Sequence, residues 1–244
     1  MTTGTLYGVG VGPGDPELIT VKGAAVLARC PHVFVPKART AAESVALSIT
    51  GRYIGRNAKV HELLFPMTSD NDELSTRWKE NARAVAGVLE GGEDACFITL
   101  GDLFLYSTYI YLLREIRNII PDLNVISIPG VTSFSAAASL SSFPVGEGRE
   151  PVSVIPASAD DLGAVREALK KKGTVILMKI GRRLPEILDI IDSEGLIDRG
   201  IFASRAGMEG ERVETDLRKL RGAAPEAGYL SIILVHAGKK EEHK

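Results

Sequence analysis

Several features are scarce or missing in this 244-residue sequence, and each absence excludes a class of protein. Lysine and arginine number 29 and aspartate and glutamate 31, so a nucleic-acid partner is not expected. No apolar run approaches the roughly 18 residues of a membrane-spanning helix. No basic leader precedes the first predicted strand, which argues against secretion and against a membrane partner.

Residues that bind metals or form disulfides are also few. The two cysteines, Cys30 and Cys96, lie far apart in the sequence and among apolar residues. Reduced thiols in the core of a cytoplasmic protein are therefore expected. Together with four scattered histidines, two cysteines do not readily form a zinc site, so we predict no metal.

The two common phosphate-binding motifs are missing as well. No Gly-Lys-Ser or Gly-Lys-Thr occurs, which excludes the Walker-type loop. A dinucleotide fingerprint requires glycines at its first, third and sixth positions. Counting from Gly8 places Pro13 sixth, and counting from Gly10 places Asp15 there.

What the sequence does have is an unusual glycine-rich loop close to its start. An apolar run from Thr5 to Val11 ends in Gly-Pro-Gly-Asp, and a helical pattern follows from Glu17 to Ala28. This pattern predicts a buried strand, a tight turn and a helix capped by Asp15. Taken alone, the loop is explained by a tight strand-to-helix turn at least as well as by a ligand site.

The order of predicted elements indicates an α/β protein with two α/β domains. Strands and helices alternate through residues 1–143, which predicts a mostly parallel sheet with helices on both faces. A segment rich in proline and glycine, residues 143–148, marks a boundary. Residues 144–244 have shorter helices and more strand, so a second domain with a mixed sheet is expected.

Three further strand ends carry glycine or small polar residues. They are Gly101-Asp102, the segment Pro129–Ser133 and the segment Met178–Gly181. Ligands of open α/β sheets bind beyond the carboxyl ends of the strands, so these loops could share one cleft with the opening loop. Asp102 could accept hydrogen bonds from a ribose or an amine, or only cap a helix beginning near Leu105. Ser133 could likewise be only a helix cap, and Met178 only a core residue.

Together these segments resemble the class III tetrapyrrole methylases, S-adenosylmethionine-dependent enzymes of cobalamin and sirohaem synthesis. The resemblance rests on Val9–Thr20, Gly101-Asp102, Tyr106–Thr108 and Pro129–Ser133, in that order. Within the family, Gly101–Tyr109 followed by Tyr111-Leu112 is most similar to C20-methyltransferases, which act on precorrin-2 or its cobalt-bearing counterpart, cobalt-factor II. One position departs from the family, because Leu103 replaces its usual proline and leaves the loop shape open.

The resemblance implies a tetrapyrrole methylase fold, with S-adenosylmethionine bound in a cleft between the domains and S-adenosylhomocysteine as product. It also implies a homodimer. Carried over by position, the implied cofactor contacts are Pro13, Gly101, Asp102, Leu105, Thr132, Ser133, Met178, Ala206, Ser231 and Ile232.

The implied substrate is a small molecule, a flat macrocycle edged with carboxylates. Arginine and lysine are the side chains that pair with carboxylates. The candidates follow predicted strand ends: Lys37, Arg39, Lys179, Arg182, Arg183 and Arg205. Each of them could also be ordinary surface charge.

No catalytic residue is identified by this reasoning. Methyl transfer requires alignment and exclusion of water more than acid–base chemistry. A group is needed to accept the proton from the methylated carbon, and Tyr106, His61 and Glu115 are candidates that could equally be structural.

Two other functions remain open. The chain could be another methylase of the same fold, with a different tetrapyrrole position, a protein or ribosomal RNA as target. It could also be a non-catalytic nucleotide-binding module. Preference for S-adenosylhomocysteine over a phosphorylated ligand would separate these classes.

Overall fold

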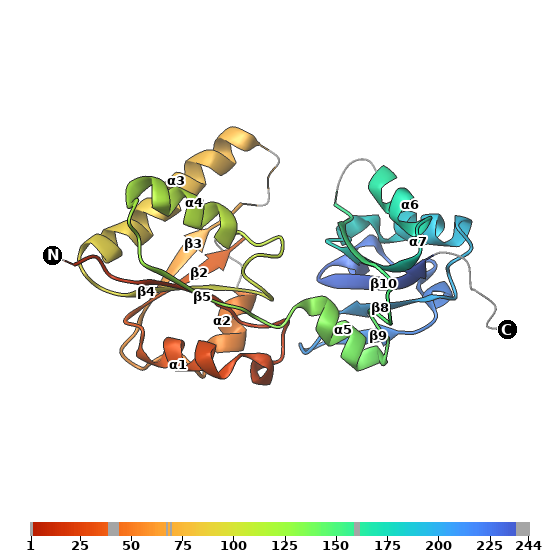
Figure 1. Ribbon diagram of the computed structural model, residues 1–244, viewed down its shortest axis with the longest axis horizontal. Helices are drawn as coiled ribbons and strands as arrows, with labels where there is room; N and C mark the ends of the chain where they lie inside the picture. The colour runs from red at the N-terminus through yellow and green to blue at the C-terminus, as the bar shows by residue number, and fades with distance from the viewer. Residues whose placement is uncertain (1, 39–43, 67, 69, 159–161, 238–244) are drawn as a thin grey trace. The chain divides into compact units, whose positions relative to one another are not determined.

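The computed structural model describes residues 2–38, 44–66, 68, 70–158 and 162–237 (Figure 1). The chain divides into two compact units, Met1–Thr132 and Ser133–Lys244. The helix α5 (Ser133–Ser141) belongs to the second unit because it packs against strands of that unit's sheet. The proline- and glycine-rich segment around residues 143–148 therefore follows the first helix of the second unit.

Unit 1 is built on a five-stranded sheet in the order β3-β2-β4-β1-β5, and all of its strand pairs are parallel. The strands are β1 (Leu6–Gly10), β2 (His32–Lys37), β3 (Lys59–Leu64), β4 (Ala95–Thr99) and β5 (Val125–Ile128). The helices are α1 (Val21–Arg29), α2 (Val45–Thr50), α3 (Asn71–Glu90) and α4 (Tyr109–Ile119). Figure 1 shows α3 and α4 on one face of the sheet and α1 and α2 on the other. The parallel N-terminal sheet was predicted from the alternation of elements and is confirmed.

The first helix begins later than expected. Residues Pro16–Leu18 form a separate 3₁₀ turn, η1, in which the N–H of Glu17 donates to the Asp15 carboxylate. The helix α1 starts after Thr20, whose hydroxyl accepts from the N–H of Gly23 at 3.1 Å. Asp15 thus caps the short turn, and the prediction of one continuous helix from Glu17 is wrong because a second capping residue follows it.

The face of unit 1 that carries α3 and α4 is rich in aromatic contacts. Phe97 of β4 and Tyr109 of α4 are fully buried, and their ring centroids lie 5.9 Å apart. Nearer the surface, the Trp78 ring of α3 stacks on the Tyr111 ring of α4, with centroids 4.5 Å apart and ring planes 4° from parallel. The Arg114 guanidinium lies 6.0 Å from the Tyr111 ring centroid. These contacts fix α4 against α3 and hold the start of α4 beside the end of β4.

Unit 2 has a mixed five-stranded sheet in the order β6-β7-β10-β8-β9, as the sequence predicted. Only β6 and β7 pair in parallel. The strands are β6 (Val152–Pro156), β7 (Gly173–Met178), β8 (Gly200–Ser204), β9 (Arg212–Glu214) and β10 (Ser231–Ala237). Besides α5, the helices are α6 (Gly163–Leu169) and α7 (Leu184–Ser193), with 3₁₀ turns η2 (Gly181–Arg183), η3 (Leu217–Leu220) and η4 (Pro225–Gly228).

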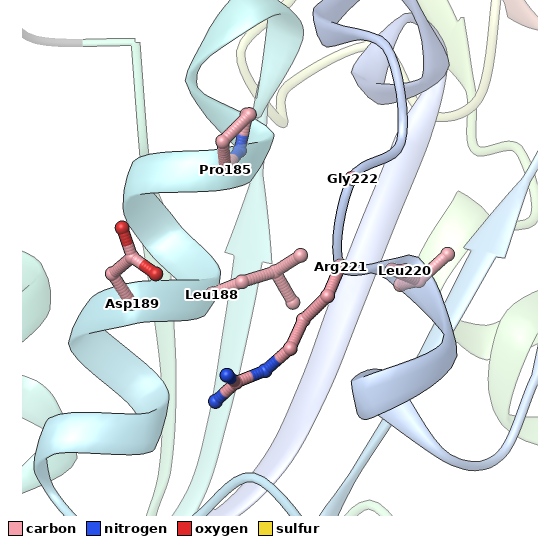
Figure 2. Close-up of a pocket in the computed structure, with 6 residues that line it drawn as sticks. All are labelled: Pro185, Leu188, Asp189, Leu220, Arg221 and Gly222. Carbon is pink, nitrogen blue, oxygen red and sulfur yellow. The ribbon is translucent and has the colours of Figure 1, made fainter.

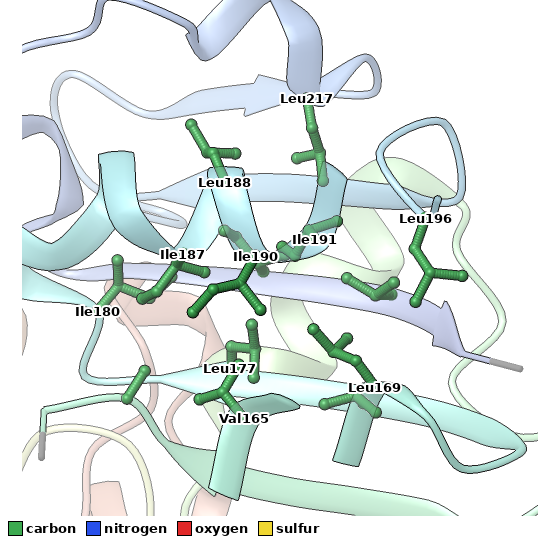
Figure 3. Close-up of a cluster of buried hydrophobic side chains, with 14 of the residues drawn as sticks. Val165, Leu169, Leu177, Ile180, Ile187, Leu188, Ile190, Ile191, Leu196 and Leu217 are labelled. Atoms are coloured by element: carbon green, nitrogen blue, oxygen red, sulfur yellow. The ribbon is translucent and has the colours of Figure 1, made fainter. Parts of the chain in front are cut away.

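The main core of unit 2 lies between its sheet and the helices α6 and α7 (Figure 3). Ile187 and Ile191 of α7, Leu177 of β7 and Val165 of α6 all belong to this cluster. Full burial of such a side chain contributes about 1.5–3 kcal/mol. The apolar residues of α7 recur at helical spacing, so this helix buries one face and anchors the strands that carry the site described below.

Within the described ranges, no helix has the length and apolar character needed to cross a membrane. The same residues include no cluster of three or more histidine, cysteine, aspartate or glutamate side chains that could hold a metal ion. Cys30 and Cys96 are both free thiols, and both are buried.

Candidate active site

In unit 1, three loops meet at the carboxyl ends of the strands β1, β4 and β5. The strands end level, because Gly10 pairs with Thr99 and Val9 pairs with Ile128. Beyond the strands, Gly12 and Gly101 exchange backbone hydrogen bonds of 3.3 and 2.7 Å. The glycine-rich opening loop and the loop after β4 are therefore joined directly. This agrees with the prediction that both loops lie at the same edge of the sheet.

Asp102 connects this pair of loops to the third. Its Oδ2 accepts a hydrogen bond from the N–H of Gly130 at 3.1 Å, and its Oδ1 accepts from the N–H of Phe104 at 2.9 Å. The carboxylate is half-buried. The prediction that Asp102 caps a helix beginning near Leu105 is wrong, because α4 begins at Tyr109 and the intervening residues form a loop.

Glycines at this edge are required by close backbone packing. A Cβ on Gly130 would overlap the carbonyl oxygen of Gly101, and one on Gly10 would lie 2.5 Å from the backbone nitrogen of Gly130. Gly101 itself has a φ of 70°, and a Cβ there would have no atom within 4 Å. The backbone of Gly101 thus borders open space at the centre of the three loops, where a ligand can approach it closely.

The other predicted cofactor residues of unit 1 lie on the same three loops. Pro13 is buried in the opening loop, Leu105 is half-buried after β4, and Thr132 is the last residue of the unit after β5. Leu103, which replaces the family's proline, is fully buried in the core cluster that contains Tyr109. Its apolar side chain anchors the loop, so the hydrogen bonds of Asp102 form without a proline at this position.

In unit 2, the corresponding edge is marked by three residues with left-handed backbones. Lys179 (φ 55°) directly follows β7, Arg205 (φ 51°) directly follows β8, and Leu230 (φ 51°) directly precedes β10. Because β10 is antiparallel to both β7 and β8, these residues come to one edge of the sheet. The N–H of Arg205 donates to the carbonyl of Leu230 at 2.9 Å. Left-handed residues other than glycine cost about 1–3 kcal/mol and cluster at functional sites.

The predicted cofactor residues of unit 2 sit beside these left-handed positions. Met178 is half-buried at the end of β7, while Ala206, Ser231 and Ile232 are buried. The Ser231 hydroxyl donates to the carbonyl of Gly228 at 2.7 Å. Ser133 is the first residue of α5. Leu230 was missed by sequence reasoning, since leucine gives no signal for a left-handed backbone.

The cations predicted to bind substrate are spread over both units. Lys37 of unit 1 forms an ion pair with Glu62 at 2.9 Å, and Arg39 lies outside the described residues. In unit 2, Arg182 pairs with Glu226 at 2.9 Å. Arg183 donates to both carboxylate oxygens of Glu186. Lys179 and Arg205 are exposed at the left-handed positions described above. Lys179 lies shortly before Arg182 and Arg183 in the chain, and Arg205 directly precedes Ala206.

The structure separates the three candidate proton acceptors. His61 Nε2 lies 2.8 Å from Nδ1 of His32, whose Nε2 is in turn 2.8 Å from a carboxylate oxygen of Glu93. His32 is the first residue of β2, so this cluster is at the amino ends of the strands, opposite the joined loops. Glu115 lies six residues into α4, about 9 Å along the helix axis from its start. Only Tyr106 is on a loop at the carboxyl edge.

A hollow of about 220 Å³ lies elsewhere in unit 2 (Figure 2). Its lining residues come from α7, from the last residue of η3 and from the two residues that follow it: Pro185, Leu188, Asp189, Leu220, Arg221 and Gly222. The Arg221 guanidinium forms an ion pair with Asp192 of α7. None of the predicted site residues lines this hollow, and it is not the candidate active site.

Comparison with known proteins gives one consistent result. The family model for tetrapyrrole (corrin/porphyrin) methylases matches residues 5–221. The chain is 35% identical over 233 residues to the cobalt-precorrin-2 C(20)-methyltransferase of Salmonella typhimurium, with 96% of each chain covered. It is 29% identical over 244 residues to the precorrin-2 C(20)-methyltransferase of a Sinorhizobium species, covering 97% of this chain and 96% of the relative.

Solved structures of lower identity share the fold. A cobalt precorrin-4 methyltransferase superposes with a TM-score of 0.75 at 19% identity, covering 95% of this chain and 94% of the other. The uroporphyrin-III C-methyltransferase of Thermus thermophilus, solved in complex with S-adenosylhomocysteine, gives 0.62 at 19% identity, covering 95% and 92%. The resemblance drawn from the loop sequences is thus confirmed, and the chain belongs to the tetrapyrrole (corrin/porphyrin) methylase family.

Proposed function

We propose that this protein transfers a methyl group from S-adenosylmethionine to C20 of precorrin-2, or of its cobalt-bearing form, during corrin ring synthesis. The observation that carries the proposal is the match to two C20-methyltransferases over nearly the whole of each chain. The relatives named for C11 methylation of precorrin-4 match only 55–56% of this chain, so methylation at C11 is less well supported than methylation at C20.

The residues present fit the proposed cofactor. In unit 1, Gly101 has open space where a side chain would stand, and the Asp102 carboxylate is adjacent to it. A carboxylate has acceptor capacity beyond the two N–H groups that it already binds, and its charge favours a cationic ammonium or sulfonium group. In unit 2, Met178 and Ala206 offer apolar side chains against which an adenine ring could pack.

The chemistry asks little of the side chains. When bound, S-adenosylmethionine supplies a methyl group on a positively charged sulfur, already activated for attack by carbon. The loops of unit 1 would orient the macrocycle so that C20 meets this methyl group in line. Such alignment can contribute about 7–11 kcal/mol to lowering the barrier. C20 would form the new carbon–carbon bond as the bond between sulfur and the methyl group breaks, its electron pair would remain on sulfur, and the proton of C20 would pass to a base or to water.

The substrate's peripheral carboxylates would be held by the cations named above. Lys179, Arg182, Arg183 and Arg205 lie near the site edge of unit 2, and Lys37 lies at the end of β2 in unit 1. Arg182 pairs with Glu226 at the surface, and an exposed pair of this kind contributes only about 0–1 kcal/mol. Arg182 can therefore exchange this partner for a substrate carboxylate at little cost. We also propose that the protein forms a homodimer and that it is located in the cytoplasm.

The test is incubation of the purified protein with S-adenosylmethionine and precorrin-2, and separately with the cobalt-bearing form. We expect a product heavier by one methyl group, with the new methyl on C20 by NMR. Calorimetry should show binding of S-adenosylhomocysteine and no preference for ATP. Methylation at another ring position, or binding of the phosphorylated ligand alone, would contradict the proposal.

A further inference from the structure

The loop between β4 and α4 contains a tyrosine with an unusual backbone. Tyr106 has a φ of 53°, in the left-handed region, where an aromatic side chain is disfavoured. A residue stays in this region only when the structure around it leaves the chain no alternative. The fixed points on either side of Tyr106 show how this is achieved.

On one side, Asp102 binds the N–H groups of Phe104 and Gly130 and so fixes the first turn of the loop. On the other side, the Ser107 hydroxyl lies 3.0 Å from the Thr99 hydroxyl at the end of β4 and accepts from the N–H of Tyr109 at 3.1 Å. Ser107 is 7% exposed. The left-handed turn at Tyr106 is what brings Ser107 back into the protein.

Two aromatic side chains between the two fixed points are partly exposed. Leu103 and Tyr109 are fully buried, whereas Phe104 is 56% exposed and Tyr106 is 37% exposed. Part of each ring is therefore exposed at the edge where Gly101 borders open space, and the Phe104 ring also meets the Tyr109 ring edge-on, with centroids 5.6 Å apart. An exposed pair of aromatic rings in a fixed, strained loop is unusual unless the rings serve recognition.

We infer that Tyr106 is a substrate-positioning residue whose ring packs against the tetrapyrrole. This inference rests on the proposed function. A flat, uncharged ring gives a large contact area to a conjugated macrocycle, and the hydroxyl at its tip can bond to a peripheral carboxylate. Of Tyr106, His61 and Glu115, the three candidates for accepting the proton, Tyr106 alone lies at this edge. Its role is orientation of the ring system.

The experiment compares Tyr106→Asn with Tyr106→Phe. Asparagine tolerates the left-handed backbone, so the loop is retained while the ring is removed. We expect Tyr106→Asn to raise the KM for precorrin-2 by at least about ten-fold, the equivalent of one aromatic contact. The Kd for S-adenosylhomocysteine should stay within about two-fold of the parent value. Tyr106→Phe keeps the ring, so its KM should remain within about three-fold.

Ile119→Gln provides the control, because it removes another exposed apolar side chain, 38% exposed, at the far end of α4 in the same unit. Its KM should not change. If the parent protein does not methylate precorrin-2, the proposed function fails and this inference fails with it. If the parent is active but Tyr106→Asn leaves KM unchanged, or weakens S-adenosylhomocysteine to the same extent, only the inference is overturned. If Tyr106→Phe raises the KM for precorrin-2 as much as Tyr106→Asn does, the inference is also overturned, because the ring is still present in Tyr106→Phe.

Discussion

The carboxylate of Asp102 accepts a hydrogen bond from the backbone N–H of Gly130 at 3.1 Å and thereby joins the loops that follow β4 and β5. A second hydrogen bond, from the N–H of Phe104, uses its other oxygen. The bidentate acceptor geometry requires a carboxylate, since an amide has only one accepting oxygen. The candidate site of unit 1 therefore depends on the charge state and length of this one side chain.

Asp102→Asn should lose one of these two hydrogen bonds. We expect the free energy of unfolding of the protein to fall by about 1–3 kcal/mol, because one backbone N–H is left unsatisfied. Affinity for S-adenosylhomocysteine should fall as well, and calorimetry measures it. Asp122→Asn, in an exposed turn of the same unit, is the control. Equal stability of both variants would contradict the assigned role of Asp102.

Gly130→Ala tests the close packing of the loops. The new methyl group would overlap the Gly101 carbonyl and approach Gly10, so overpacking should cost at least about 1–3 kcal/mol. Gly87→Ala is a matched control in α3, since a Cβ there would have no neighbour within 4 Å. That control should gain about 0.5–1 kcal/mol from helix propensity. Chemical denaturation measures both, and destabilisation by Gly87→Ala or none by Gly130→Ala would refute the packing argument.

Arg182 and Arg183 can be tested together as substrate cations. The double change to glutamine should raise the KM for precorrin-2 by about ten-fold or more, because two potential carboxylate partners are lost. The Kd for S-adenosylhomocysteine should not change. Arg166→Gln, on the exposed face of α6, serves as the control. Unchanged tetrapyrrole affinity in the double variant would remove both arginines from the proposed site.

The His32–His61–Glu93 cluster predicts a pH dependence of stability. Burial, with the nearby charges of His32 and Lys59, lowers the pKa of His61 in the folded protein. The unfolded chain therefore binds more protons than the folded chain between that lowered pKa and about 6.5. The free energy of unfolding should consequently fall as the pH drops below about 6.5. Urea titrations on either side of that pH should show a smaller fall for His61→Gln, and an equal fall would exclude His61 as a source.

The two cysteines should be unreactive in the folded protein. Burial raises the pKa of Cys30 to about 11 and holds that of Cys96 well above its usual value. Because the thiolate is the reactive form, a thiol reagent should modify neither residue near neutral pH and both after unfolding in guanidinium chloride. Rapid modification of the native protein would show that the core opens around these strands.

Much of this architecture could be predicted from the sequence. The parallel sheet followed by a mixed sheet is visible as alternating apolar strands and amphipathic helices, and the loops joined at Gly12, Gly101 and Gly130 are visible as glycines at strand ends. These features are local, because they depend on composition within one element or one turn. The start of α1 was misplaced because Asp15 and Thr20 are both good capping residues and only tertiary packing selects between them.

The backbone conformations at the sheet edge of unit 2 were harder to infer. Lys179, Arg205 and Leu230 adopt left-handed backbones that their side chains do not favour, so no propensity predicts them. Their conformation follows from the antiparallel insertion of β10 between β7 and β8, a long-range pairing. The same holds for Asp102, whose bond to Gly130 depends on the register of three strands and not on the residues around it.

The stacking of Trp78 on Tyr111 has a practical consequence, since Trp78 is the chain's only tryptophan and belongs to unit 1. Tryptophan fluorescence reports on unit 1 alone, whereas far-ultraviolet circular dichroism reports on the secondary structure of both units. Denaturation curves recorded with the two spectroscopic probes will coincide if the units unfold in one cooperative transition and diverge if each melts independently.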